Sequence, residues 1–320
     1  DKKGFNAAYR VLNSDKKHPF VNRAVTSRFP PGSTFKPITA VAGLERGTLN
    51  PNWSTTCTGG FHMGRRFGCW STHGGGINLE RALAVSCNVY FYQQSLKMGN
   101  PESTGPTWLA QQARRFGLGS KTGIDLPVDA KGLVPDPAWR REINASRPDL
   151  ARWFPGNTLN MSIGQGDVLA TPLQMANAIA TIANGGTLYK PHLMKEVRDA
   201  NNRVLKSAQL RGESIGVKPG NLALVRKGMR AVVASGTGKS VALPHVAVAG
   251  KTGSAEDANH VLPHAWWVCF APYDPTGRVK PRIAIAVIVE NSGHGSENAV
   301  PVAKKILEAA FPVPKNASTR

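Results

Sequence analysis

Four stretches of the chain combine apolar residues with the start and stop signals of helices. The predicted helices cover residues 33–44, 79–96, 169–183 and 221–234. The body of the first, residues 38–44, is apolar nearly all round, which predicts a buried helix, and Pro37 lies early enough in it to be tolerated. The second is expected to bend or break near residues 86–88, whose polar side chains favour caps.

The last third of the chain changes to short β-branched or aromatic runs. Bounded by turn residues, these runs predict consecutive antiparallel strands at residues 246–249, 265–270 and 282–289. A closing helix is expected over residues 299–310, with Asn298 as its N-cap and Pro301 in its first turn. The pattern therefore predicts an α+β fold in which one antiparallel sheet carries helices on both faces.

Composition indicates a globular chain. The 320 residues are 41% hydrophobic and contain no internal repeat and no linker, so we expect one compact domain over residues 1–320. No uncharged apolar run approaches the ~20 residues that span a bilayer. The chain starts at Asp1 with a polar, loop-like stretch to about Arg28, which indicates a trimmed fragment of a longer protein that has lost an anchor. Residues 50–76 show no period.

A net charge of +20 raises nucleic acid as a partner. The basic residues do not gather in a tail or a helix stripe, however, and the longest clusters are pairs such as Arg65-Arg66 and Arg140-Arg141. No zinc-finger, RNA-recognition or helix-turn-helix signature accompanies them. We therefore expect a diffusely basic surface and no nucleic-acid partner.

Candidate chemistry begins with Ser33-Thr34-Phe35-Lys36. At a helix start, the i, i+3 spacing places the hydroxyl of Ser33 and the amine of Lys36 on one face. A desolvated lysine can be neutral enough to act as the base that activates a serine nucleophile. This spacing alone is a weak signal, because a capped helix followed by a surface lysine has the same letters.

Two later motifs strengthen the first. Ser86-Cys87-Asn88 lies at the expected helix break, and Lys251-Thr252-Gly253-Ser254 follows a strand-like run. Ser-x-x-Lys, Ser-x-Asn and Lys-Thr-Gly form an ordered set in serine acyl-transfer enzymes. Lys121-Thr122-Gly123 repeats the last motif but follows no apolar strand, and we interpret it as a structural turn.

Six segments, in order, resemble the transpeptidase domain of class B penicillin-binding proteins, and together they extend over nearly the whole chain. They are Pro30-Pro31-Gly32-Ser33-Thr34-Phe35-Lys36-Pro37, Ser86-Cys87-Asn88-Val89-Tyr90-Phe91-Tyr92, Thr122-Gly123-Ile124-Asp125-Leu126-Pro127, Gly164-Gln165-Gly166, Thr171-Pro172-Leu173-Gln174 and Val248-Ala249-Gly250-Lys251-Thr252-Gly253. The stretch around Trp70 and His73 resembles the elongation-specific subfamily, penicillin-binding protein 2. The resemblance implies the penicillin-binding-protein/serine β-lactamase-like fold.

The resemblance also implies an activity and the residues that perform it. The family's enzymes are D,D-transpeptidases that cross-link peptidoglycan stem peptides and are acylated by β-lactams, and they need no cofactor for catalysis. Carried over, Ser33 attacks the D-Ala-D-Ala carbonyl and Lys36 takes its proton. Ser86 relays a proton to the leaving D-alanine, and Asn88 holds the substrate amide and Lys36.

The third motif supplies the remaining implied contacts. Backbone N–H groups of Ser33 and Ser254 form the oxyanion hole. Lys251 adds positive potential, Gly253 lets a substrate backbone approach, and Thr252 and Ser254 bind the terminal carboxylate. Ser254 stands where threonine is commoner, and Asn88 where this subfamily often has aspartate.

Location and partners are implied by the same resemblance. We expect the periplasmic face of the bacterial inner membrane, with the SEDS-family glycan polymerase RodA and the elongation scaffold as partners of the longer protein. Two alternatives use the same motifs. One is a serine β-lactamase or D,D-carboxypeptidase with water as acceptor, and the other is a β-lactam-sensing receptor domain that stays acylated.

A cluster of cysteines and one histidine precedes and overlaps the second motif. Cys57, Cys69, His73 and Cys87 offer three thiolates and an imidazole, the ligand set of a closed zinc site. The alternative is a Cys57–Cys69 disulfide with Cys87 a buried thiol. Resemblance to zinc-holding relatives favours a structural zinc. His62 is a possible substitute ligand, Cys269 is expected in the core, and no chemistry is assigned to His260, His264 and His294.

Overall fold

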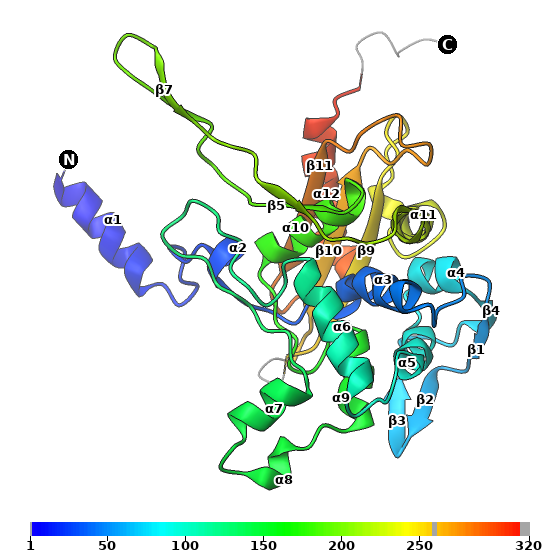
Figure 1. The fold of residues 1–320 in the computed structure, drawn as a ribbon. Helices are drawn as coiled ribbons and strands as arrows, with labels where there is room; N and C mark the ends of the chain where they lie inside the picture. Colours follow the sequence, from blue (N-terminus) through cyan, green and yellow to red (C-terminus); the bar gives the residue numbers. More distant parts are fainter. Residues whose placement is uncertain (1, 258–260, 314–320) are drawn as a thin grey trace.

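The last third of the chain builds a central antiparallel sheet in this computed structural model, which describes residues 2–257 and 261–313 (Figure 1). Its strands lie in the order β11, β10, β9 and span Ile283–Val289, His264–Ala271 and Ala249–Ala255. The middle strand β10 is buried along its whole length, because strands flank both its edges and helices cover both its faces. This arrangement confirms the predicted α+β fold and its antiparallel sheet.

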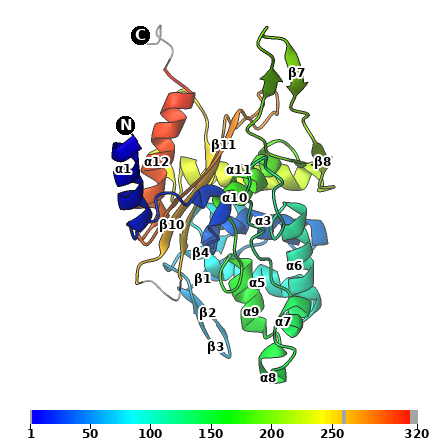
Figure 2. The same cartoon turned by 90° about the vertical axis from the view of Figure 1, so that its left-hand side faces the viewer.

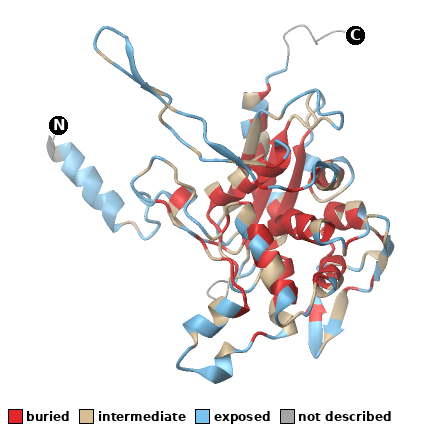
Figure 3. Ribbon diagram, viewed as in Figure 1, coloured by how far each residue is buried: buried red, intermediate tan, exposed pale blue. Residues whose placement is uncertain are grey.

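Alternate residues of β10 belong to two different cores. Trp267 and Cys269 pack with residues of α12 (Gly295–Ala310), so the expected core position of Cys269 is confirmed. Trp266 and Val268 join the larger core, to which α10 (Pro172–Ala183) and α3 (Lys36–Arg46) contribute. Since successive side chains of a strand point to opposite faces, the sheet separates the two helical layers (Figures 2 and 3).

The larger layer contains most of the helices. Its longest member is α11 (Pro219–Ala234), which packs against both α4 (Leu79–Ala84) and β9. The other helices between α3 and α10 are α5 (Asn88–Lys97), α6 (Thr104–Arg115), α7 (Pro137–Ile143), α8 (Pro148–Ala151) and α9 (Pro155–Ser162), and the chain also has the short 3-10 turns η1 (Gly32–Phe35) and η2 (Lys239–Val241). The predicted break in the second helix is confirmed, because Ser86 lies between α4 and α5 with φ +55°.

Two helix boundaries differ from the predictions, because side chains near them make hydrogen bonds that the sequence does not reveal. The third predicted helix starts at Pro172 rather than at residue 169, because the side chain of Thr171 caps it by accepting from the Gln174 N–H. The closing helix α12 starts at Gly295, so Pro301 lies inside it rather than in its first turn. Asn298 is not its N-cap, since its side-chain amide donates to the Ser292 carbonyl at 2.6 Å.

Several short strands lie outside the central sheet, and the sequence pattern did not indicate them. Residues 55–77 form two small antiparallel pairs, and a second region forms a long two-stranded arm that extends from the body (Figure 1). The first set is β1 (Thr55–Cys57), β2 (Gly60–Met63), β3 (Arg65–Gly68) and β4 (Gly74–Ile77), and the arm holds β5 (Thr187–Tyr189), β6 (Glu196–Arg198), β7 (Val204–Ser207) and β8 (Gly212–Ser214).

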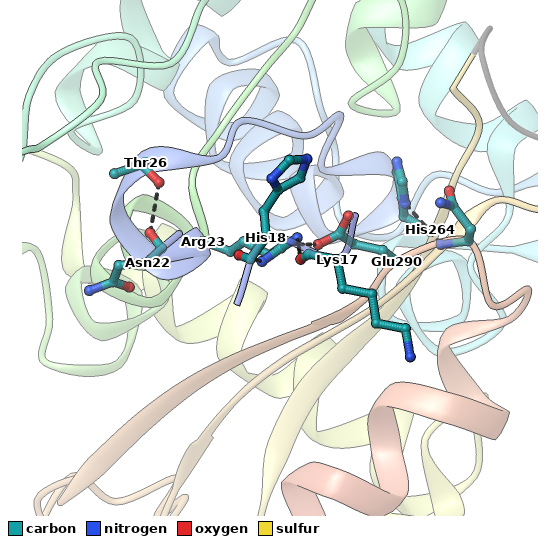
Figure 4. A network of polar contacts seen from close by, with 8 residues as sticks. Lys17, His18, Asn22, Arg23, Thr26, His264 and Glu290 are labelled. Carbon is teal, nitrogen blue, oxygen red and sulfur yellow. Dashed lines mark hydrogen bonds and ion pairs between the residues drawn. The ribbon is translucent and has the colours of Figure 1, made fainter. Parts of the chain in front are cut away.

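The expected loop-like start is wrong, because the chain opens with helix α1 (Lys2–Ser14) and the short α2 (Arg23–Thr26). In α1, Phe5 and Tyr9 are one helical turn apart and their rings stack. The start is tied to the sheet by Arg23, whose Nε lies 2.6 Å from Glu290 and whose guanidinium also donates to the His18 carbonyl (Figure 4). Among the described helices, none has the length and apolar character needed to cross a membrane.

Candidate active site

Ser33 lies in the tight turn η1, where a glycine fixes the backbone. Gly32 has φ +53°, and its N–H donates to the Gly164 carbonyl at 2.9 Å. A side chain on Gly32 would meet the Ser254 carbonyl oxygen at 2.8 Å, so the turn packs directly against β9. Ser33 itself is half-buried at this junction.

Lys36 begins α3 and is fully buried, and its ammonium group links the first two motifs. Its Nζ donates to the Asn88 Oδ1 at 2.6 Å and to the Ser86 carbonyl at 2.7 Å, and it lies 3.2 Å from the Ser86 hydroxyl. Burial, the largest influence, lowers the pKa of Lys36 to about 8, partly opposed by the negative charge of the neighbouring Cys69 thiolate. At pH 7 about a tenth of this amine is therefore neutral and able to accept a proton.

Ser86 and Asn88 are placed by the break between two helices. The left-handed backbone of Ser86 turns the chain so that its carbonyl and hydroxyl both reach Lys36. The side-chain amide of Asn88 donates to the Gly68 carbonyl at 3.0 Å while its oxygen accepts from Lys36. One N–H of that amide is therefore committed to Gly68, which leaves one for the predicted substrate contact.

The third motif forms the middle of β9. Lys251 is fully buried, donates to the Thr252 carbonyl at 3.1 Å, and has its pKa lowered well below the ordinary value by burial and by the charge of Lys36. A side chain on Gly253 would meet Thr34 at 2.9 Å, so this glycine is what lets β9 lie against the Ser33 turn. The structure thus brings all three motifs together.

The edge of β9 that faces the Ser33 turn is identified by one carbonyl. The Ser254 carbonyl accepts from the Gln165 side chain at 3.5 Å and lies close to Gly32. In an antiparallel strand, the N–H and C=O of one residue point to the same edge. The Ser254 N–H is therefore directed toward η1, the orientation that an oxyanion hole shared with Ser33 requires.

Two residues that the sequence analysis did not assign also touch this motif. The Thr237 hydroxyl lies 2.6 Å from the Thr252 hydroxyl, and His294 Nδ1 lies 3.3 Å from the Ser254 hydroxyl. Thr237 follows α11 in a turn that the sequence marks only as a helix stop, and His294 has no partner at a recognisable spacing. Neither position carries a sequence signal, because each contact joins residues that are distant along the chain.

Lys121-Thr122-Gly123 lies outside the central sheet, as predicted for a structural turn. The Thr122 hydroxyl and the Gly123 N–H both donate to the Asp129 carboxylate, at 3.1 and 2.7 Å. The sequence resemblance between the two Lys-Thr-Gly segments therefore does not extend to their surroundings.

The four candidate metal ligands meet beside the Ser86 motif. One ligand atom from each of Cys57, Cys69, His73 and Cys87 lies within 4.8 Å of all the others, and Cys69 Sγ is 3.6 Å from His73 Nδ1. The cysteines are not joined by disulfides in this structure. A hydrogen bond from Cys87 lowers the pKa of Cys69 to about 4 and raises that of Cys87. His62 is not in the cluster, and His260 lies outside the described residues.

Comparisons with known proteins agree with this geometry. The model of the penicillin-binding protein transpeptidase domain family matches residues 2–308, so the chain belongs to that family. The peptidoglycan D,D-transpeptidase MrdA of Acinetobacter baumannii is 35% identical over 94% of this chain and 45% of its own length. The chain therefore spans about half the length of this curated relative.

Solved structures give the same result. A peptidoglycan synthase complex contains a chain with TM-score 0.83 and 32% identity, covering 98% of this chain and 51% of that one. Pseudomonas aeruginosa PBP2 in complex with WCK 5153 has TM-score 0.79 and 34% identity, and the match covers 97% of this chain and 67% of that one. An imipenem acyl-enzyme complex of Mycobacterium tuberculosis penicillin-binding protein A has TM-score 0.77 and 28% identity, and the match covers 95% of this chain and 65% of that one.

Proposed function

We propose that the chain is a peptidoglycan D,D-transpeptidase that cross-links stem peptides through a serine acyl-enzyme during cell elongation, and that β-lactams acylate the same serine. One observation carries this proposal: the buried Lys36 amine joins Ser86 and Asn88 beside the Ser33 turn, against which β9 packs. The activity named for the curated relative and the acyl-enzyme of the mycobacterial protein support it.

In the proposed acylation step, Lys36 is the base that takes the Ser33 proton. Neutral Lys36 donates its two N–H groups to the Ser86 carbonyl and Asn88 Oδ1, which leaves its lone pair for the Ser33 proton. The Ser33 Oγ forms a bond to the D-Ala-D-Ala carbonyl carbon, and Ser33 and Ser254 N–H groups stabilise the oxyanion. In hydrolases each such donor contributes about 3 kcal/mol.

The leaving group departs when the C–N bond between the two D-alanines breaks. The Ser86 hydroxyl lies 3.2 Å from Lys36 Nζ and passes a proton from Lys36 to the departing amine. The amine of a second stem peptide then attacks the acyl-enzyme, and Ser33 regains its proton. Burial lowers the pKa of Lys251 well below its ordinary value, and the substrate carboxylate bound by Thr252 and Ser254 would favour its charged form.

Intact mass spectrometry with benzylpenicillin tests the proposal. We expect a persistent one-to-one adduct on the chain and none on Ser33→Ala. A transient adduct with drug hydrolysis would indicate a β-lactamase instead, and a stable adduct with no turnover of stem-peptide substrates would indicate a receptor domain. No adduct on folded protein would contradict the assignment of Ser33, Lys36 and Lys251.

We also propose that Cys57, Cys69, His73 and Cys87 hold a structural zinc. The four ligand atoms lie within 4.8 Å of one another. In a tetrahedral zinc site, neighbouring ligand atoms are separated by less than ~4 Å, so a small contraction of the cluster would accommodate the ion. Four protein ligands leave no position for water, so the ion would support the fold and take no part in the reaction. It would tie the loop of residues 57–73 to the Ser86 motif.

Zinc content and thermal stability test this second proposal. We expect one equivalent of zinc after purification without added metal, and a fall in Tm when a chelator removes it, because metal binding free energy is folding free energy. The Cys269→Ala variant is a matched control that should keep the metal. A mapped Cys57–Cys69 disulfide with little zinc would contradict the proposal.

We further propose that the chain forms one transpeptidase domain of a membrane-anchored protein at the periplasmic face of the bacterial inner membrane. The family substrate, peptidoglycan, lies outside that membrane, and the similar chain of the peptidoglycan synthase complex is about twice as long. RodA and the elongation scaffold would be partners of the longer protein. Affinity purification of that longer protein with RodA checks the partnership, and failure to retain RodA would contradict it.

A further inference from the structure

The two hydroxyls of Thr237 and Thr252 form one of the shortest side-chain contacts at the candidate site. Their oxygens are 2.6 Å apart, and Thr252 is 7% exposed. The pair joins the turn after α11 to the strand that carries the third motif. Because a hydroxyl has a single proton, only one of the two can donate in this contact.

Thr237 is held rigidly by backbone contacts from both sides. Its N–H donates to the Ala84 carbonyl at 3.1 Å, at the end of the helix that leads to Ser86. Side chains on the glycines that flank it would clash, on Gly236 with the Ala84 carbonyl and on Gly238 with the Trp267 ring. The Thr237 hydroxyl is therefore presented to Thr252 by packed backbone rather than by a free loop.

A bound carboxylate decides which hydroxyl donates. A carboxylate only accepts hydrogen bonds, so Thr252 must give it its own proton. The contact with Thr237 can then persist only if Thr237 is the donor. With Thr237 donating, the Thr252 proton is directed away from the pair, and less reorganisation is needed when substrate arrives.

We propose that Thr237 is a positioning residue of the carboxylate site, which orients the Thr252 hydroxyl so that it donates to the terminal carboxylate of the substrate. This inference rests on the proposed transpeptidase function. Thr237 does not touch the reacting atoms, and it acts through Thr252. It therefore affects ligands with a free carboxylate and spares ligands in which that group is masked.

The test compares acylation by benzylpenicillin and by its methyl ester, measured as the second-order rate of adduct formation by intact mass spectrometry. We expect Thr237→Val to lower the rate with benzylpenicillin several-fold, up to about tenfold, the weight of one lost hydrogen bond between neutral groups. With the ester the same variant should acylate at a rate within about twofold of the unsubstituted chain, because the charged acceptor is absent.

Further variants separate the hydroxyl from packing. Thr237→Ser keeps the hydroxyl and should acylate at the normal rate. Thr237→Ala removes the hydroxyl and should acylate as slowly as Thr237→Val, so the test remains valid if Thr237→Val does not fold. Thr237→Val/Thr252→Val should be no slower than Thr252→Val alone, because both changes remove one interaction. Thr181→Val is the matched control, since the Thr181 hydroxyl bonds to the Asn177 carbonyl in α10.

Two results would overturn the inference and leave the proposed function standing. One is a normal rate for Thr237→Val and Thr237→Ala with benzylpenicillin, and the other is an equal loss with benzylpenicillin and its ester. Absence of an adduct on the unsubstituted chain with either ligand would instead overturn the proposed function, and this inference with it.

Discussion

At the scale of single residues, the candidate site depends on a lysine that is inside the protein. Lys36 has no exposed surface, and its three neighbours, the Ser86 carbonyl, the Ser86 hydroxyl and Asn88 Oδ1, all approach its Nζ. The sequence predicted a desolvated lysine because the helix around it is apolar nearly all round. It could not predict the partners, because they come from a motif fifty residues away whose orientation depends on one left-handed residue, Ser86.

The burial of Lys36 leads to a prediction for pH. Its pKa is lowered to about 8, so the amine is mostly protonated below pH 8 and mostly neutral above it. Since only the neutral amine can take the Ser33 proton, the acylation rate should rise as pH increases through about 8 and then level off. Adduct formation with benzylpenicillin, timed by mass spectrometry between pH 6 and 10, measures this profile.

Lys36→Arg is the control for this profile. The guanidinium stays charged at every pH of the series, so acylation should be lost throughout rather than shifted. A rate that falls with increasing pH in the unsubstituted chain would contradict the assignment of Lys36 as the base.

At the scale of elements, the site exists because β9 can lie against η1. The approach needs Gly253, whose added side chain would come within 2.9 Å of Thr34 and 3.0 Å of Trp266. The Gly253→Ala variant should therefore push the strand from the turn and move the Ser254 N–H away from the oxyanion position. We expect acylation by benzylpenicillin to fall by more than about tenfold, since one oxyanion donor is worth that much or more.

A second glycine variant separates this displacement from a general loss of β-structure. Gly75, in β4, has only Thr56 nearby, at 3.6 Å, so Gly75→Ala should leave acylation unchanged. Circular dichroism and Tm should show both variants folded. An unchanged acylation rate in Gly253→Ala would show that the contact between strand and turn does not position the oxyanion hole.

Element prediction from the sequence succeeded where packing and periodicity agree. The buried helices, β10 and β11 have long apolar runs, and all of them are present. The strand predicted at residues 246–249 was misplaced, because β9 spans residues 249–255 and consists of the polar and glycine residues of the third motif itself. Prediction failed for β1 to β4, whose three or four residues include several glycines and carry no alternation. It also failed for α1, where Phe5, Tyr9 and Leu12 recur at i, i+4 and i+7, a helical period that the prediction overlooked. The start of α12 was also misplaced, because the sequence does not show that Asn298 is engaged by a loop carbonyl.

At the scale of the whole molecule, the central sheet with its two helical layers contrasts with the arm formed by β5 to β8. Buried residues fill both faces of the sheet, whereas β7 is exposed along its whole length (Figure 3). The base of the arm is held by Asp125, whose carboxylate accepts from the N–H groups of Leu193 and Met194 at 2.7 and 2.9 Å. Beyond that base, the arm shares little buried surface with the site.

The outer arm should therefore be dispensable for acylation and for the stability of the body. The Ala208 N–H donates to the Lys195 carbonyl at 2.8 Å, so these residues can be joined by an Asn-Gly turn that replaces residues 196–207. We expect the shortened chain to react with benzylpenicillin at the normal rate and to keep its Tm within a few degrees. Asp125→Ala is the contrasting variant, because it removes the hydrogen bonds that hold the base of the arm to the body, and it should lower Tm. Loss of acylation in the shortened chain would mean that the arm supports the site, because the Asp125 contacts at its base would still be intact.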